Sequence, residues 1–356
     1  MEYKGKKLTV AVYGHPHGPC VGMVMTGLPA GVPVDVPTLR AFLRRRAPGQ
    51  SSHTTARREP DIPEFCGGLE NGVTTGEPLR VEIRNQDVHS RDYAPFRDIP
   101  RPSHADYPAL MKYGAAYDIR GGGPFSARMT APLCAAGGIA LQWLLNRGIR
   151  VGGHIAAVGG VQDRPFDPVH VCADDFDRIL QNEVPVLDKA AGAAMLQAVD
   201  GARRDGDSVG GLVECAAVGL PVGLGGPLLD GLESSLSAAL FAIPAVKGVA
   251  FGSGFEAAAL RGSKHNDPYR VQNGRVITET NHAGGLLGGM TTGMPLIVKL
   301  AFKPTPSIAQ PQRSVSLSRM ENARLTIAGR HDPCVALRAV PIVEAMVGLV
   351  LMDQML

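Results

Sequence analysis

The segment GGLENGVTTGEPL, residues 67–79, agrees at most positions with GGLLGGMTTGMPL, residues 284–296. A second pair lies in the same order: GLPAG, residues 27–31, and GLPVG, residues 219–223, each follow an apolar, strand-like run. Two collinear matches with a period of roughly two hundred residues favour an internal duplication over chance. The chain is therefore expected to fold as two related halves that share a middle.

We expect these halves to form one domain, residues 1–356, with pseudo-repeats at about 1–205 and 206–356, because no linker rich in glycine, serine or charge separates them. A chain of 356 residues can bury a large interior, with two cores inside the one domain. The 44 glycines and 28 prolines punctuate apolar segments, which predicts many tight turns and not disorder.

Apolar, partly alternating runs predict strands, and longer apolar segments with helix boundary signals predict helices. The C-terminal helix is apolar on nearly all sides, so it should lie buried between layers, with Pro341 at a kink or in its first turn. This pattern predicts a helical layer packed between two sheets. The predicted strands are residues 8–13, 21–26, 79–83, 211–218 and 296–301, and the predicted helices are residues 38–46, 129–146, 174–202 and 334–356.

Composition excludes several classes of protein. A charged fraction of 19% and a net charge of +3 are too mild for a nucleic-acid-binding surface. No uncharged apolar run is long enough for a membrane span, and the start MEYKGKKLTVAVYG lacks the apolar core of a signal peptide. The six cysteines form no C-x-x-C pair, which favours a soluble protein of the reducing cytoplasm.

Three short segments crowd chemically reactive side chains together: Tyr13 to Gly18 around His17, Arg101 to Tyr107 around His104, and Arg330 to Cys334 around Asp332. Imidazole can donate or accept a proton near neutral pH, because its reference pKa is about 6.5. We expect one site assembled from distant parts of the chain. The alternatives are that the histidines are buried structural groups and that Asp332 merely orients Arg330.

Basic residues predict that this site binds an anion. The run Arg120 to Ser126 precedes a predicted helix, with Ser126 as its N-cap, so backbone amides and Arg128 are placed to hold a phosphate or carboxylate. A plain turn and, for the arginines near residue 45, a solvated helix face are the alternatives. The further basic residues are Arg44, Arg45, Arg46, Arg57, Arg58, Arg101, Arg330 and Lys303.

Ten motifs in one order resemble the chorismate synthase family from end to end. That resemblance implies an α+β fold, a β-α-β sandwich with a helical layer between two antiparallel sheets, and a homotetramer. The motifs are YGHPHGPCVGMVMTGLPAG, RRRAPGQSSHTTARREPD, VTTGEPL, RPSHADYPALMKYG, DIRGGGPFSARMTA, DSVGG, IPAVKGVAFGSGF, NHAGGLLGG, KPTPSI and GRHDPCVALRAVPIVEAM, from residue 13 to residue 346.

The resemblance also implies the chemistry. The substrate would be 5-enolpyruvylshikimate 3-phosphate, a small molecule with one phosphate and two carboxylates. The reaction would be its 1,4-trans elimination of phosphate to chorismate, in the shikimate pathway of aromatic amino acid biosynthesis. Reduced FMN would be required without net redox change, and NADPH would enter only indirectly, through an external flavin reductase.

By the same resemblance, His17 would protonate the leaving phosphate, His104 would stabilise the charge of the reduced flavin, and Asp332 would help the flavin accept the substrate proton. The implied substrate-binding residues are His17, Arg45, Arg46, Arg101, Arg128 and Arg330. The implied FMN-binding residues are Ser126, Ala245, Gly288, Lys303, Thr305, Ser307 and Arg330. The pair His15-x-His17 lacks a third ligand of convincing spacing, so no metal site is predicted.

Several positions depart from the family pattern, and they fall in the motifs that should form the pocket. Losses of both signs suggest that ion pairs were removed together, which can be nearly neutral. A divergent flavin-binding paralogue acting on a related anionic cyclohexene, and a non-catalytic homologue, are therefore the alternative functions. The departures are His15, Pro16, Ala47, Ser103, Pro124, Phe125, Met129 and Gly226.

Overall fold

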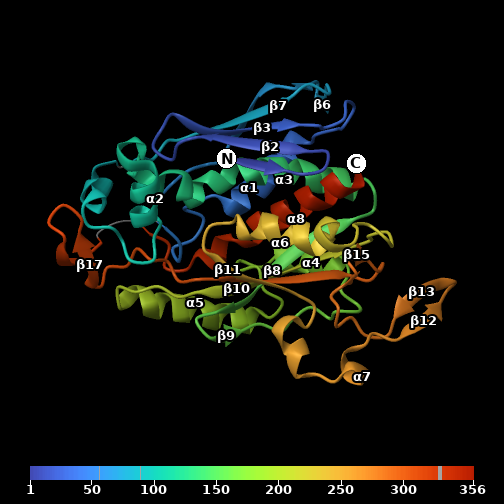
Figure 1. The fold of residues 1–356 in the computed structure, drawn as a ribbon. Coiled ribbons are helices and arrows are strands. Elements are labelled where there is room, and N and C mark those ends of the chain that lie inside the picture. Colours follow the sequence, from blue (N-terminus) through green and yellow to red (C-terminus); the bar gives the residue numbers. More distant parts are fainter. Residues whose placement is uncertain (56, 89, 328–330) are drawn as a thin grey trace.

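The computed structural model describes residues 1–55, 57–88, 90–327 and 331–356. Two five-stranded antiparallel sheets lie on either side of a layer of helices (Figure 1), which confirms the predicted α+β sandwich. In strand order, the first sheet contains β1 (Glu2–Lys4), β2 (Thr9–Gly14), β3 (Cys20–Thr26), β7 (Leu79–Arg84) and β4 (Pro63–Gly67). The second contains β11 (Val246–Phe251), β16 (Leu296–Phe302), β10 (Gly211–Val218), β8 (Arg150–Val158) and β9 (Val161–Gln162).

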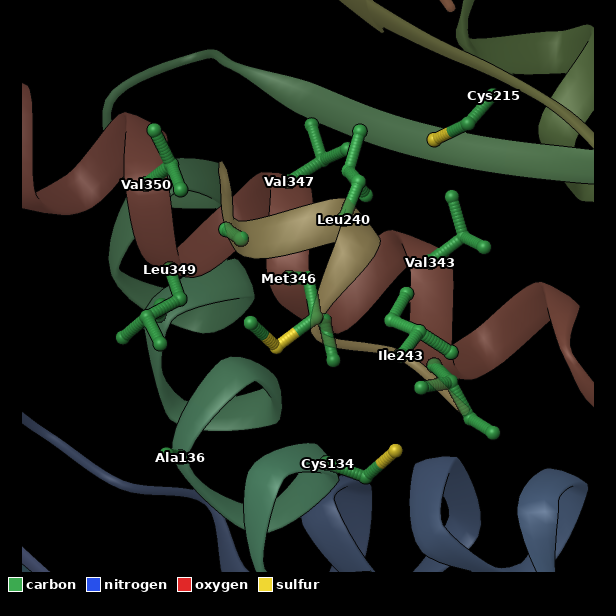
Figure 2. Close-up of a cluster of buried hydrophobic side chains, with 14 of the residues drawn as sticks. Cys134, Ala136, Cys215, Leu240, Ile243, Val343, Met346, Val347, Leu349 and Val350 are labelled. Carbon is green, nitrogen blue, oxygen red and sulfur yellow. The ribbon is translucent and has the colours of Figure 1, made fainter. Parts of the chain in front are cut away.

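The helical layer is built around α8, whose residues from Val340 to Asp353 are all buried. Figure 2 shows α8 side chains such as Met346 and Val350 among apolar side chains from the neighbouring helices. Helix α3 approaches α8 closely at Gly137, where an added Cβ would lie 2.4 Å from the Cβ of Ala345. The layer consists of α1 (Val36–Arg46), α3 (Thr130–Leu145), α6 (Leu232–Phe241) and α8 (Val340–Met355).

The two sheets share one strand order, since β2-β3-β7-β4 corresponds to β8-β10-β16-β11. The repeated segments also form matching contacts. The Thr74 hydroxyl donates to the carbonyl oxygen of Pro29 at 2.6 Å, and the Thr291 hydroxyl donates to that of Pro221 at 2.5 Å. Strand β8 begins at Arg150, so the second sheet takes strands from both sides of the predicted boundary near residue 205.

The predicted strands are confirmed, but the single helix predicted at residues 174–202 is wrong. The structure has α4 (Ala173–Leu180) and α5 (Lys189–Arg204) instead. Pro185 lies between them and has no backbone N–H to continue a helix, while the Asp188 carboxylate caps α5 by accepting from the Ala190 amide at 2.8 Å. The predicted C-terminal helix starts later, at Val340, after a 3-10 turn, η7 (Val335–Arg338).

The remaining elements are short and lie outside the two sheets and the helical layer (Figure 1). None of the helices in the described part of the chain combines the length and apolar character needed to cross a bilayer. The helices are η1 (Ser90–Arg97), α2 (Asp106–Tyr113), η2 (Gly114–Ala116), η3 (Arg120–Phe125), η4 (Ala127–Met129), η5 (Leu228–Asp230), η6 (Gly254–Ala259) and α7 (Gly262–His265). The strands are β5 (Leu69–Glu70), β6 (Val73–Thr74), β12 (Tyr269–Gln272), β13 (Arg275–Thr278), β14 (Leu286–Leu287), β15 (Met290–Thr291), β17 (Gln312–Ser316) and β18 (Glu321–Leu325).

Candidate active site

A cavity of about 560 Å³ collects most of the predicted site residues from both halves of the chain. Its walls come from the end of α1, the loop before α2, the turns η3 and η4, and the loops that follow α6 and β16. Segments that are far apart in sequence therefore meet at one place, as expected. The predicted residues that line the cavity are Arg46, Arg101, His104, Ser126, Arg128, Ala245, Lys303, Thr305, Ser307 and Asp332.

Four of the residues that were given a catalytic or binding role are not among those that line it. Arg45 turns to the helical layer and makes a bidentate ion pair with Glu344, at 2.6 and 2.9 Å. Gly288 is exposed at the turn between β14 and β15. His17 lies beside the cavity wall, and Arg330 lies outside the described residues.

His17 stands directly behind the glycine turn of the cavity. A Cβ at Gly121 would lie 2.6 Å from the His17 ring, so only glycine leaves room for the imidazole there. The ring also packs edge-on against Tyr93, another lining residue, with centroids 5.1 Å apart. Burial, followed by the charge of Arg57, lowers the pKa of His17 to about 4, so the ring is neutral at pH 7 in the free protein.

His104 is oriented by a carboxylate. Its Nδ1 lies 2.6 Å from Oδ1 of Asp106 and 3.1 Å from a guanidinium nitrogen of Arg101. Such a short contact with a carboxylate requires a proton on Nδ1, which leaves Nε2 as the other reactive nitrogen, near Gly122. Burial lowers the pKa of His104 despite the opposing effect of Asp106, so the ring is expected to be neutral at pH 7.

Arg46 and Arg128 reach the cavity as a pair held by one carboxylate. Asp61 is completely buried, and its Oδ2 accepts from Nε of Arg46 at 2.8 Å while its Oδ1 accepts from Arg128. Arg128 also donates to the side-chain oxygen of Asn85 at 2.8 Å. Two guanidinium groups against one carboxylate leave a net positive charge beside the cavity, although Glu59 lies 3.8 Å from Arg128.

Arg101 forms a second basic wall. It donates to both oxygens of Asp106, at 2.7 and 2.8 Å, and to the hydroxyl of Ser307 at 3.2 Å. Its guanidinium carbon lies 4.6 Å from the centre of the Phe96 ring, a cation-π contact. These contacts fix the orientation of the side chain, so Arg101 presents preset donors to the cavity.

Asp332 is held at the cavity by three neighbours. Its Oδ1 accepts from the Thr55 amide and its Oδ2 from Arg338, both at 2.8 Å, and its backbone carbonyl accepts from the Thr305 hydroxyl at 2.7 Å. A carboxylate that is fixed on both oxygens and still lines the cavity is well placed to handle a proton.

The loop of residues 303–307 adds a cation and two hydroxyls. Lys303 donates to the carbonyl oxygen of Ser103, and burial, followed by the charge of Lys247, lowers the pKa of Lys303. Ser126 also lines the cavity and caps the short turn η4 by accepting from the Arg128 amide at 3.3 Å; the predicted helix itself, α3, begins later, with Met129 as its N-cap. The cavity thus combines cations, hydroxyls and a helix start, which is the donor set that phosphate and carboxylate groups need.

Sequence reasoning missed several residues that complete the walls. Tyr93 lines the cavity, and the carboxylates of Asp61 and Asp106 hold the arginines and His104 in place from behind. Arg57, which is among the predicted basic residues, lines the cavity as well, and so does Arg338. The acidic residues were detectable only as members of the family-like motifs. Nothing in the sequence placed Tyr93 against His17.

The departures from the family pattern fall into two groups. Ser103, Pro124 and Phe125 line the cavity, and the two latter residues add apolar surface to it. His15 contacts Asp118, with Nε2 and a carboxylate oxygen 3.6 Å apart. Ala47, Met129 and Pro16 are buried, and Gly226 packs against the β14–β15 turn through its amide, 3.3 Å from the Gly289 oxygen.

Comparison with known proteins accounts for this geometry. The sequence profile of the chorismate synthase family matches residues 8–356. The chorismate synthase of Thermococcus gammatolerans is 47% identical over 354 residues, 99% of this chain and 97% of that protein, and that of Dehalococcoides mccartyi is 46% identical over 98% and 95%. A crystal structure of a chorismate synthase has a TM-score of 0.77 at 25% identity and covers 98% of this chain and 92% of the other. These matches favour the synthase over a divergent paralogue or a non-catalytic homologue, and this enzyme belongs to the chorismate synthase family.

Proposed function

We propose that the chain is a phosphate-eliminating lyase that converts 5-enolpyruvylshikimate 3-phosphate to chorismate. In that reaction a ring C–H bond and the C–O bond to phosphate break, and a new ring double bond forms. The observation that carries the proposal is one cavity lined by Arg46, Arg101, Arg128, His104 and Asp332. Several guanidinium groups with preset orientations suit a substrate with one phosphate and two carboxylates.

The residues divide the work as follows. Arg46, Arg101 and Arg128 bind and orient the anionic groups, since charge-assisted hydrogen bonds contribute about 1.5–3 kcal/mol each. Asp332 would assist the transfer of the ring proton to the bound flavin. His17 protonates the departing phosphate. A phosphate bound beside the His17 imidazole would raise the pKa of His17 from about 4 toward neutrality.

The cavity also suits reduced FMN, which would lend electron density to the substrate ring when bound. Lys303, Thr305 and Ser307 line one loop and offer a point charge and two hydroxyls for the phosphate of the cofactor. Ala245, in the loop between α6 and β11, lines the same cavity, and its backbone has a positive φ of 73°. His104 would present its Nε2 to the cofactor, and an external flavin reductase would supply the reduced form.

We further propose a cytoplasmic homotetramer. All six cysteines are free, which fits a reducing compartment. The exposed position of Gly288, away from the cavity of its own chain, fits a role that requires a neighbouring copy. Gel filtration coupled to light scattering would test the assembly directly.

The proposed activity is tested by mixing the enzyme anaerobically with the phosphorylated substrate and chemically reduced FMN. Stoichiometric release of phosphate and chorismate is expected, with no turnover when the flavin stays oxidised. His17→Asn serves as the matched variant and should bind substrate but turn over far more slowly. Binding of the substrate without any phosphate release would refute the proposal.

A further inference from the structure

The motif DSVGG, residues 207–211, lines no part of the cavity, yet its first residues and the end of α5 that precedes them contact three of the cavity loops. We call residues 200–209 the α5 end. Helix α5 covers the outer face of the second sheet, away from the helical layer (Figure 1). The loops that it contacts are residues 51–55, 305–310 and 332–333.

The first contact holds the loop of residues 51–55. Arg203 donates from one guanidinium nitrogen to the carbonyl oxygen of Ser52 and from another to that of Thr54, the latter at 3.3 Å. One turn earlier, Asp200 Oδ1 lies 2.9 Å from Nδ1 of His53. Three consecutive residues of the loop are therefore tied to one helix.

The second and third contacts come from the turn after α5. The Ser208 hydroxyl donates to the carbonyl oxygen of Thr305 at 2.7 Å. The carbonyl oxygen of Gly206 accepts from the Ala309 amide at 2.9 Å. The Val209 amide donates to the carbonyl oxygen of Pro333, the residue after Asp332, also at 2.9 Å.

These three loops are the ones that hold Asp332. The Thr55 amide binds its carboxylate, the Thr305 hydroxyl binds its backbone carbonyl, and Pro333 follows it in the chain. The α5 end thus contacts the loops that carry Thr55, which binds the Asp332 carboxylate, and Thr305, which binds the Asp332 carbonyl.

We propose that Arg203 and Ser208 are positioning residues for Asp332. This inference rests on the proposed function, because the placement of Asp332 affects turnover only if its carboxylate takes part in the proton transfer. Both residues act through the loops and neither lines the cavity. Arg203 binds the loop of residues 51–55 through backbone carbonyls, and Ser208 binds the loop of residues 305–310 in the same way, so their removal loosens these loops without changing any side chain that faces the ligand.

A small displacement is enough to matter, because a misplacement of about 1 Å far from the chemistry can lower a rate about 100-fold. For Arg203→Ala and Ser208→Ala we expect kcat to fall about tenfold or more while KM changes by less than about threefold. Arg203→Lys keeps the charge and one donor, so it should recover part of the loss. Arg204→Ala is the matched control: the Arg204 side chain is exposed and makes no hydrogen bond or ion pair within the described ranges.

A second measurement does not depend on turnover. Hydrogen exchange of the Thr55 amide reports its bond to Asp332, and it should accelerate in Arg203→Ala but not in Arg204→Ala. Unchanged kcat in both alanine variants, or an equal fall in the Arg204 control, would overturn the positioning role. If the wild-type enzyme shows no turnover, the proposed function fails, and the Thr55 exchange alone decides: no acceleration in Arg203→Ala overturns the inference.

Discussion

Replacing Asp61 with asparagine should destabilise the folded enzyme strongly. The Asp61 side chain is fully buried, and the side chains of Arg46 and Arg128 that it joins are only 2% and 3% exposed. Asparagine keeps the shape but puts an NH₂ group where one guanidinium needs an acceptor, so one buried cation loses its partner. Removing one member of a buried ion pair costs about 3–5 kcal/mol, and this is the expected fall in the free energy of unfolding.

Urea unfolding at pH 7 measures this change, with Glu64→Gln as the control. Glu64 pairs with Arg84 on the exposed surface, at 2.8 Å, and its loss should not change stability measurably. Inorganic phosphate should stabilise Asp61→Asn more than the wild type, because an anion in the cavity partly replaces the lost carboxylate.

The stabilisation that the Asp61 carboxylate provides should depend on pH in a definite direction. Burial raises the pKa of Asp61, but the charges of Arg46 and Arg128 outweigh it and hold that pKa below its usual value. The stabilisation is therefore present above the unfolded pKa of about 3.9 and is lost as the pH falls through the lower folded pKa. The difference in the free energy of unfolding between the wild type and Asp61→Asn should therefore become smaller at acid pH. A difference in the free energy of unfolding below about 1 kcal/mol at pH 7 would refute the reasoning, since breaking a buried ion pair should cost more than that.

Three other predictions concern different parts of the molecule. Substrate binding at pH 7 should take up a proton at His17, seen by calorimetry in buffers of different ionisation enthalpy; uptake that is unchanged in His17→Asn would contradict this. Gly137→Ala should lower the free energy of unfolding by about 1–3 kcal/mol through overpacking of α3 on α8, whereas Gly201→Ala, with open space at its Cβ, should not destabilise. His154 bridges the buried carboxylates of Asp163 and Glu214; burial lowers the pKa of His154, but the two carboxylates outweigh it and raise that pKa. The protonated bridge therefore stabilises the fold fully below about pH 6.5, and this stabilisation is lost as the pH rises through the pKa of the folded state. Between pH 6 and pH 9 the wild type should therefore lose more stability than His154→Gln, and equal losses in urea unfolding would exclude the bridge.

The repeated segments and the almost uncharged C-terminal helix predicted the architecture well, because both report directly on burial. A helix such as α8 that is apolar on nearly all sides is expected inside the molecule, and the repeats require similar turns in both halves. The break between α4 and α5 was missed because the apolar pattern continues across it. The structure shows that Pro185 and the cap at Asp188 outweigh that pattern.

Which cations would face the cavity was harder to predict, because that depends on partners distant in the sequence. Arg45 and Arg46 are adjacent, yet one pairs with Glu344 in the helical layer and the other reaches Asp61 beside the cavity. Neighbours on a helix point in different directions, so a run of arginines does not reveal which of them faces a ligand. Similarly, only the fold places His17 against Gly121.

The most direct test of the account is a crystal structure of the enzyme with oxidised FMN and the phosphorylated substrate. The account predicts both ligands in the one cavity, with the substrate anions on Arg46, Arg101 and Arg128 and the cofactor phosphate on the loop of residues 303–307. His17 and Asp332 should both lie within reach of the substrate. Either ligand bound elsewhere, with this cavity left to solvent, would contradict it.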